Sequence, residues 1–472
     1  MLRPLLLLSM LLCATAARAQ VPEPVAQALR AANVPQSAVG IVVQPVDGPR
    51  PSLAVNAAEP MNPASVMKLV TTYAGLEILG PAYRWKTEAW TSGTLRDGVL
   101  EGDLALKGGG DPKLVLEDFW LLLKNIRERG LRELRGDLVL DRSRFAPLEH
   151  DPARFDSEPF RPYNVGPDAL LVNFKSVRFH FLPQPDAGTV SVLAEPRLHP
   201  LGVVNVLKLA NGGCGDWRRQ IRPDFQPAPA GRQGFHAIFS GSYPARCGEK
   251  TWNVSIFSHT NYVAGLFRHL WEESGGTWTG TTRSEAVPAG AKLLYTHVSR
   301  PLSEVVRDIN KFSNNVMARQ LYLSLAAQAS SAPANTASAF RAVQGWLALK
   351  GLDFPELVIE NGSGLSRIER ISAQSMARML VAAFRSATMP EFMASMPLVA
   401  VDGTMRRRLK GEEVAGQAHI KTGALADVRA ISGYVLDREG RRHAVVMIIN
   451  HANAGAAMPA LEAMIRWTYD RG

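Results

Sequence analysis

The chain has 472 residues, 46% of them hydrophobic and 20% charged, with a formal net charge of +10. This composition is typical of a globular protein and excludes a disordered or fibrous one, and the length suggests two or three domains. Nucleic acid is a poor candidate partner, because the basic residues are scattered and the tight run "MRRRLK" (405–410) is too short for a binding stripe.

The first residues, "MLRPLLLLSMLLCATAARAQ", predict a cleaved signal peptide over 1–19. No later segment approaches the roughly 20 apolar residues of a membrane helix, so we expect an exported, soluble mature chain. Its two cysteines, Cys214 and Cys247, most simply form one disulfide in an oxidising compartment, and neither has metal-ligand spacing with a histidine. An exported basic chain suits a cell-wall polymer or an anionic membrane face, although a solvated basic surface without a partner explains the charge equally well.

The first half of the mature chain changes its pattern once. A β-branched run at 37–46 predicts a strand, and an apolar helix is expected from about 64 to 79, ending at Gly80-Pro81. From about Trp85 short alternating runs predict a β-rich region with one helix near 113–129. Residues 181–250 are rich in proline and glycine, which suggests a smaller loop-rich module.

Helical periodicity returns in the second half and strands lie among the helices. The segments 417–423, 429–437 and 443–450 predict strands, the last two of them an antiparallel hairpin. Because the two ends of the chain share this texture and the middle differs, a β-rich insertion inside an α/β domain is the simplest organisation. Helices are expected near 261–275, 301–311, 313–329, 336–350, 372–387 and 455–469.

The predicted helix at 64–79 opens with Ser65 and Lys68, three positions apart on one helical face. A buried lysine loses its charge readily, and a neutral amine beside a hydroxyl can take its proton and leave a nucleophile. A helix-start serine and a solvated surface lysine would explain the same pattern. The pair alone therefore predicts nothing.

Two further segments in the second half qualify as partners. "KFSNNV" holds Ser313 and Asn315 at a helix start, where capping alone would explain them. "HIKTGAL" places Lys421 and Thr422 before Gly423 at the end of a predicted strand, where a glycine permits close approach of a backbone or ligand. Each is weak, but S-x-x-K, S-x-N and K-T-G occur here in the order found in penicillin-binding proteins and class A β-lactamases.

The three motifs, together with "GDLALKGGGDPKL" (102–114), "NGSGLSR" (361–367) and "MPLVAVDGTM" (396–405), resemble the D-alanyl-D-alanine carboxypeptidase/endopeptidase family of class C low-molecular-mass penicillin-binding proteins, peptidase family S13. The resemblance spans nearly the whole mature chain. It implies an α/β fold, in which a transpeptidase-like domain with an antiparallel sheet and flanking helices carries a β-rich nested insertion. The expected domains are catalytic at 20–85 and 286–472, a β-rich insert at 86–165 and 251–285, and a smaller nested insert at 166–250.

The resemblance also implies roles. Ser65 would attack the carbonyl between two D-alanines with Lys68 as the favoured base, and Ser313 would relay the proton toward the leaving amine. Asn315 would hydrogen-bond the substrate amide, and Lys421 would supply positive charge near the terminal carboxylate.

The resemblance further implies substrate-binding residues. Thr422 would bind the terminal carboxylate, beside Gly423, and the backbone N–H groups of Ser65 and Ala424 would bind the tetrahedral oxyanion. Arg367 and Thr404 resemble substrate contacts, although capping or structural roles would explain them equally well.

One position departs from the family pattern. Relatives often carry an acidic residue after a proline–aromatic–asparagine stretch to hold the free amine of the stem peptide, but Val165 stands there, with Asp168 as a substitute candidate.

The resulting hypothesis is a periplasmic serine D,D-peptidase that acts on peptidoglycan stem peptides, is acylated and inhibited by β-lactams, and needs no metal or cofactor. The alternatives are a β-lactamase and a wall-binding scaffold with little catalysis. The sequence leaves the balance of carboxypeptidase and endopeptidase activity, the oligomeric state and any peripheral association with membrane or cell wall open.

Overall fold

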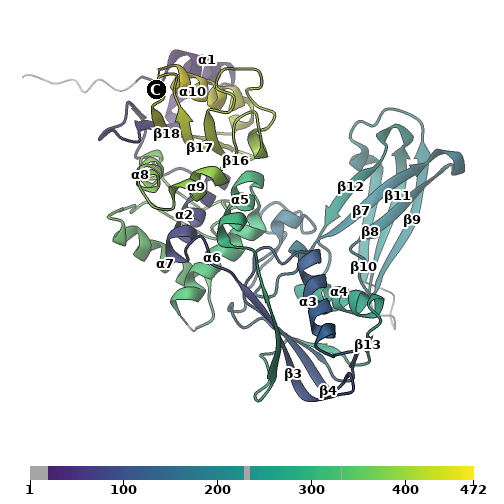
Figure 1. Ribbon diagram of the computed structural model, residues 1–472. Coiled ribbons are helices and arrows are strands. Elements are labelled where there is room, and N and C mark those ends of the chain that lie inside the picture. The colour runs from purple at the N-terminus through teal and green to yellow at the C-terminus, as the bar shows by residue number, and fades with distance from the viewer. Residues whose placement is uncertain (1–19, 228–233, 331, 472) are drawn as a thin grey trace, which may run out of the picture.

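The computed structural model describes residues 20–227, 234–330 and 332–471, which form two parts (Figure 1). One part contains both ends of the described chain, and the other contains its middle. The predicted α/β class, with an antiparallel sheet and flanking helices, is confirmed. The signal peptide expected at 1–19 lies outside the described residues.

The first part is built on a five-stranded antiparallel sheet. Strand β1 (Val39–Pro45) lies between β2 (Leu53–Val55) and β18 (Arg442–Asn450), so Val39 is opposite Ile449. The order continues through β17 (Val428–Leu436) to the edge strand β16 (Ala418–Leu425). The three strands predicted in this half are therefore confirmed, although β16 runs two residues past the predicted end, so that K-T-G lies inside the strand.

Helices cover both faces of this sheet, which explains why β17 and β18 are apolar almost throughout. On one face, α1 (Glu23–Ala31) packs against α10 (Met458–Arg471). On the other, α8 (Ala373–Phe384) contacts β1 and β18. The sequence analysis did not predict α1.

A lobe of helices extends from the α8 face (Figure 1). Helix α2 (Lys68–Ile78) lies at its centre and is buried from Lys68 to Leu76, because four helices surround it. A 3₁₀ helix (Ala64–Met67) precedes it, so the predicted helix at 64–79 is confirmed with a tighter first turn. The surrounding helices are α5 (Leu302–Phe312), α6 (Asn315–Ala329), α7 (Thr336–Leu349) and α9 (Met389–Ser395).

The middle of the chain begins with a seven-stranded sheet. Helices α3 (Leu116–Glu128) and α4 (His259–Glu273), both predicted, pack against each other beside this sheet. The sequence analysis expected the β-rich insert to end at residue 285. Strand β15 nevertheless pairs with β3, so this sheet extends past that residue. The strands are β3 (Lys86–Arg96), β4 (Val99–Gly108), β5 (Glu133–Leu134), β6 (Leu138–Asp141), β13 (Thr277–Trp278), β14 (Thr282–Arg283) and β15 (Lys292–Val298).

The remaining residues of the insert form two three-stranded sheets, so the expectation of a loop-rich module at 181–250 is wrong. Strand β10 is an edge strand, where Pro223 and Pro227 are tolerated because no neighbour on that side needs their N–H. Cys214 and Cys247 form a disulfide. The strands are β7 (Val177–Gln184), β8 (Thr189–Glu195) and β12 (Lys250–Val254) in one sheet, and β9 (Leu201–Ala210), β10 (Ile221–Pro227) and β11 (Phe235–Pro244) in the other.

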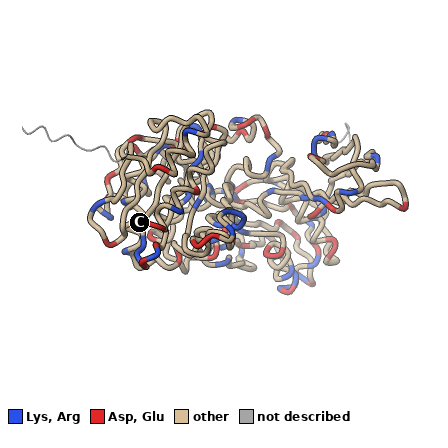
Figure 2. Tube along the Cα trace, turned by 90° about the horizontal axis from the view of Figure 1, so that it is seen from above, with Lys and Arg blue, Asp and Glu red and all other residues tan. Residues whose placement is uncertain are grey.

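Charged residues are spread over both parts, with Lys and Arg interleaved with Asp and Glu (Figure 2). Within the described residues, no helix combines the length and apolar character needed to cross a membrane. The same residues contain no cluster of three or more His, Cys, Asp or Glu side chains arranged to hold a metal ion.

Candidate active site

Ser65 lies in the 3₁₀ turn that precedes α2, half-buried, after a strained residue. The preceding Ala64 has a φ of +48°, a left-handed conformation that costs energy for a residue with a β-carbon. Asn62 holds this backbone, because its Oδ1 accepts the Ala64 N–H at 2.9 Å. Asn450, the last residue of β18, clamps the Asn62 backbone with two hydrogen bonds of 2.8 and 2.9 Å. The end of β18 therefore fixes the position of Ser65.

Two glycines let neighbouring segments approach Ser65 closely. A β-carbon at Gly423 in β16 would lie 2.5 Å from the Pro63 carbonyl oxygen and 3.3 Å from the Ser65 nitrogen. A β-carbon at Gly364 would lie 1.9 Å from the Ala64 carbonyl oxygen, and its φ of +77° also favours glycine. The strand and the loop thus contact the Ser65 turn through backbone alone.

Lys68 is fully buried at the start of α2, and its amine has three oxygen neighbours. Its Nζ lies 3.0 Å from Ser65 Oγ and 2.6 Å from Asn315 Oδ1, and it donates to the Ser363 carbonyl oxygen. Two of these oxygens can only accept, and they match the two N–H groups of a neutral amine. The lone pair of that amine then faces the hydroxyl of Ser65, which can donate to it.

The surroundings favour this neutral form. Burial lowers the pKa of Lys68 well below its ordinary value, because desolvation penalises the ammonium. The positive charge of Lys421 lowers the pKa further, and Arg319 contributes in the same direction, while Glu369 opposes them. A neutral Lys68 can act as the base that takes the Ser65 proton.

Ser313 and Asn315 belong to the junction of α5 and α6. Ser313 ends α5 with a φ of +56°, and Asn315 is the first residue of α6. The residue between them, Asn314, caps α6 by accepting the Met317 N–H at 3.0 Å. The capping role that the sequence offered for this segment therefore falls to Asn314, which leaves the Asn315 side chain to contact Lys68.

Lys421 is the second buried amine of the site. Its Nζ donates to Ser313 Oγ at 2.9 Å and to the Thr422 carbonyl at 2.7 Å. Burial lowers the pKa of Lys421 to about 7, so the amine can exchange protons near neutrality. The structure thus places Lys421 against Ser313 and Lys68 against Ser65 and Asn315.

The predicted substrate-side residues fall into two groups. Thr422 and Thr404 share a hydroxyl–hydroxyl hydrogen bond of 2.9 Å, and Gly423 and Ala424 follow in β16 beside Ser65. Arg367 makes its contacts away from Ser65, Lys68 and Lys421. Its guanidinium lies over the Phe155 ring at 4.4 Å, and its Nη1 is 3.4 Å from Asp427 Oδ1.

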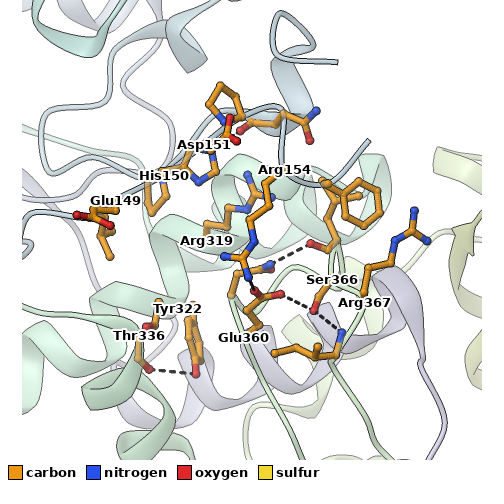
Figure 3. A pocket seen from close by; sticks show the side chains of 18 of the residues that line it. Glu149, His150, Asp151, Arg154, Arg319, Tyr322, Thr336, Glu360, Ser366 and Arg367 are labelled. Atoms are coloured by element: carbon orange, nitrogen blue, oxygen red, sulfur yellow. Dashed lines mark hydrogen bonds and ion pairs between the residues drawn. The ribbon is translucent and has the colours of Figure 1, made fainter. Parts of the chain in front are cut away.

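Arg367 lines one side of a cavity of about 310 Å³ between α6 and the loop 148–155 (Figure 3). Glu360 also lines this cavity. Its Oε1 lies 3.8 Å from Arg154 Nη2, and its Oε2 accepts a hydrogen bond from Ser366 Oγ at 2.5 Å. The Ser366 carbonyl in turn accepts from Asn62 Nδ2 at 2.9 Å. Ser366 therefore links the cavity wall to the Ser65 turn through hydrogen bonds to Glu360 and Asn62.

Val165, the departure from the family pattern, is buried and belongs to the contact between insert and α6. It packs with Leu171 against Val316, the residue after Asn315, and its carbonyl accepts from Arg319 Nη1 at 2.8 Å. Asp168 accepts from Arg142, and its own N–H donates to Gln320 Oε1 at 2.8 Å. Asp168 is thus engaged in the junction.

A model of the D-Ala-D-Ala carboxypeptidase 3 (S13) family matches residues 21–470. The chain belongs to the peptidase S13 family. This confirms the predicted family and the serine-type D-Ala-D-Ala carboxypeptidase class.

Curated relatives agree with the S13 assignment. A D-alanyl-D-alanine carboxypeptidase of Actinomadura sp. (strain R39) is 30% identical over 426 residues, which cover 87% of this chain and 77% of the relative. D-alanyl-D-alanine carboxypeptidase DacB of Haemophilus influenzae is 23% identical over 423 residues, which cover 89% and 86%. Among solved structures, penicillin binding protein 4 (dacB) of Haemophilus influenzae superposes with a TM-score of 0.79 over 94% of this chain and 99% of that one, at 22% identity.

Four residues of the site were not predicted from the sequence. Asn62 and Asn450 hold the turn of Ser65, the Ser363 carbonyl accepts from Lys68, and Glu369 lies buried beside them. Asn62 and Asn450 carried a weak signal, because Asn62 lies just before the predicted helix at 64–79 and Asn450 ends the predicted strand at 443–450. A backbone acceptor such as Ser363 leaves no side-chain signal.

Proposed function

We propose that this chain is a periplasmic D,D-peptidase that forms an acyl-enzyme on Ser65 and removes terminal D-alanine or cuts D-alanyl cross-links of peptidoglycan. The observation that carries the proposal is the position of the Lys68 amine. It is fully buried, its two hydrogen-bond acceptors suit a neutral amine, and Ser65 Oγ is 3.0 Å away. A solvated surface lysine would be exposed and would donate its hydrogen bonds to water instead of to buried protein oxygens.

In the acylation step the bond from Ser65 Oγ to the substrate carbonyl carbon forms while the hydroxyl proton moves to Lys68 Nζ. The backbone N–H groups of Ser65 and Ala424 stabilise the oxyanion, and losing one such donor typically costs about 3–4 kcal/mol of barrier. The Asn315 carboxamide oxygen is engaged by Lys68, so its NH₂ is left to donate to the substrate amide.

Collapse of the tetrahedral intermediate breaks the carbonyl–nitrogen bond, and the leaving amine takes a proton. Ser313 Oγ is bonded to Lys421 Nζ, whose pKa of about 7 allows it to supply a proton through the Ser313 hydroxyl. Thr422 and Thr404 hydroxyls bind the terminal carboxylate. Water then hydrolyses the ester: neutral Lys421 takes the water proton through Ser313, and the Lys68 ammonium returns its proton to Ser65 Oγ, so Ser65 and both amines regain their starting states.

The same attack on a β-lactam carbonyl would give a stable penicilloyl ester, and we propose β-lactams as covalent inhibitors. A solved structure of penicillin binding protein 4 (dacB) from Haemophilus influenzae holds a β-lactam, which supports this part. Membership of the D-Ala-D-Ala carboxypeptidase family supports the proposed peptidoglycan substrate.

A fluorescent penicillin tests the nucleophile. The wild-type chain should be labelled covalently, Ser65→Ala should lose all labelling, and the control Ser191→Ala in β8 of the insert should keep it. Labelling of Ser65→Ala at the wild-type rate would refute the assignment.

Mass analysis of products tests the substrate. Release of one D-alanine from a pentapeptide indicates a carboxypeptidase, and monomers from cross-linked muropeptides indicate an endopeptidase. Rapid loss of the penicilloyl label would favour the β-lactamase alternative, and no product from either peptide substrate would favour a scaffold.

A further inference from the structure

Glu369 is a fully buried carboxylate that the catalytic steps above do not use. Its Oε1 accepts the backbone N–H groups of Glu360, Asn361 and Gly362 at 3.1, 3.0 and 3.2 Å. Its Oε2 has no hydrogen-bond partner among the described residues. Glu369 thus holds the turn 360–364 through three consecutive backbone groups.

Three successive residues of this turn contact the segment 64–71, which carries Ser65 and Lys68. The Gly362 carbonyl accepts from Thr71 Oγ1 at 2.7 Å, one helical turn after Lys68. The Ser363 carbonyl accepts from Lys68 Nζ, and Gly364 lies against Ala64. Any movement of the turn would therefore change the hydrogen bonds of Lys68.

Glu369 is also the acidic group whose charge acts on Lys68, and the turn that it holds carries the Ser363 carbonyl that accepts from the Lys68 amine. The other charged groups that act on Lys68 are cations, Lys421 from β16 and Arg319 from α6. Glu369 in turn faces Lys68 and Arg319, with Tyr322 of α6 beside it. Burial raises the pKa of the Glu369 carboxyl on balance, and the three N–H groups and Lys68 oppose this rise. The geometry favours the carboxylate, because Oε1 accepts three N–H groups and no acceptor among the described residues meets a proton on Oε2.

We propose that Glu369 is a positioning residue for acylation: it holds the Ser363 carbonyl against Lys68 and is the counter-charge of the ammonium that Lys68 becomes when it takes the Ser65 proton. The proposal rests on the proposed function, because that function assigns the base to Lys68. The proton stays on Lys68 in this step, and Glu369 neither gains nor loses one.

Two effects of the charge follow. A neighbouring anion stabilises the ammonium, so it raises the proton affinity of Lys68 and delays the neutral form to higher pH. The same anion stabilises the transition state, in which positive charge develops on Lys68. Removing the charge while keeping the shape should therefore shift the titration of Lys68 to lower pH and lower the maximal acylation rate.

The direct test is the titration of Lys68 itself, followed by NMR in full-length protein labelled at lysine Cε and assigned by the signal lost in Lys68→Arg. In Glu369→Gln the midpoint of Lys68 should fall by about one pH unit. Glu356→Gln is the matched control, because Glu356 accepts the Ser372 N–H nearby and is not among the charged groups that act on Lys68. Equal midpoints in wild type and Glu369→Gln would overturn the proposal.

A second variant covers the case in which Glu369→Gln does not fold. Glu369→Asp keeps the charge but shortens the reach to the three N–H groups. Its Lys68 midpoint should stay within about 0.3 pH unit of wild type, while its maximal acylation rate falls about tenfold because the Ser363 carbonyl is less well held. A Lys68 midpoint in Glu369→Asp lowered by a full unit would contradict the role of the charge.

The rate of labelling by fluorescent penicillin between pH 5 and 9 connects this to catalysis. For Glu369→Gln we expect the acidic limb to move to lower pH and the plateau to fall about tenfold. A role in stability alone would lower the melting temperature and leave the limb in place. Absence of labelling in wild type would refute the proposed function, whereas the NMR midpoints would still decide whether Glu369 acts on Lys68.

Discussion

A basic side chain in the five-stranded sheet and one in the three-stranded sheets of the insert have pKa values shifted in opposite directions. Strand β18 is buried along its seven central residues because helices cover both faces of its sheet, whereas in β8 the residue Val190 alone is fully buried. Lys421 in the first sheet has a pKa lowered to about 7 by burial. His180 in β7 has a raised pKa, chiefly because Glu249 and Glu195 accept its ring N–H groups at 2.8 Å.

The difference shows that burial decides which force acts on an ionisable group. At Lys421 in the covered sheet, desolvation is the cause of the lowered pKa, and the result is an amine that exchanges protons near neutrality. In the open sheet, water solvates the charges and the partners merely favour the cation. Burial itself, and not one particular sheet, lowers the pKa of a lysine, since burial also lowers the pKa of Lys175 in the insert to about 8.

The largest expected effect concerns the tight approach of β16 to the nucleophile. Gly423→Ala places a methyl group 2.5 Å from the Pro63 carbonyl, so the strand must move away from Ser65. We expect acylation by fluorescent penicillin to slow about 100-fold, the typical cost of misplacing reacting groups by about 1 Å. Gly213→Ala in the insert, where nothing lies within 4 Å of the new carbon, should act like wild type. Equal rates for the two variants would remove the distinction in packing.

The second effect is a gain of stability from removing a functional charge. Lys421→Met should abolish peptidase activity and raise the free energy of unfolding at pH 6 by about 1–2 kcal/mol, because a buried amine is replaced by an apolar side chain. Urea unfolding at several pH values measures it. A lower stability of Lys421→Met at pH 6 would show that hydrogen bonds from Lys421 exceed its desolvation.

The pH dependence of this gain has a definite sign. The folded pKa of Lys421 is about 7 and the ordinary value is 10.5, so between these values the unfolded chain binds more protons. Wild-type stability therefore rises with pH across this window, and the cost of burying Lys421 is complete below pH 7. The advantage of Lys421→Met should be largest below pH 7 and shrink toward pH 10.

The smallest effect belongs to the insert. His180→Gln should cost less than about 0.5 kcal/mol at pH 5.5, because the side chains of Glu195 and Glu249 are 52% and 54% exposed and water screens the pairs. With a folded pKa above 6.5, the contribution is complete below 6.5 and is lost as the pH rises through the folded value. Unfolding at pH 8.5 should therefore not distinguish the variant from wild type.

The sequence indicated the proposed reacting groups, which the structure brings together, because their chemistry depends on side chains at fixed spacing. Ser65 and Lys68 share a helical face, and Lys421 precedes a glycine that must lack a side chain. It could not predict Ser363, which acts through its carbonyl, or Glu369, whose partners are backbone N–H groups. Such contacts arise from loop geometry and have no periodicity.

The fold was predictable where hydrophobic periodicity is strong. The buried strands β17 and β18 and the helices α5, α6 and α7 around α2 fall where the pattern places them, within a few residues, whereas the short helix α9 was not predicted. The nested sheets were missed because their prolines resemble loop residues, although Pro223 and Pro227 lie in an edge strand where no ladder bond is lost. The helix α1 was missed because it is short.

The pairing of β1 with β18 has a consequence for biosynthesis. Residue 39 pairs with residue 449, so β1 can pair with β2 early but with its other neighbour only after β18 has been synthesised. The most distant strands paired in the insert, β3 and β15, are closer in sequence than β1 and β18, so the insert can fold earlier. A nascent chain can thus carry a folded insert while the Ser65 turn still lacks the clamp from Asn450, so the proposed active site is completed only after β18 has been synthesised.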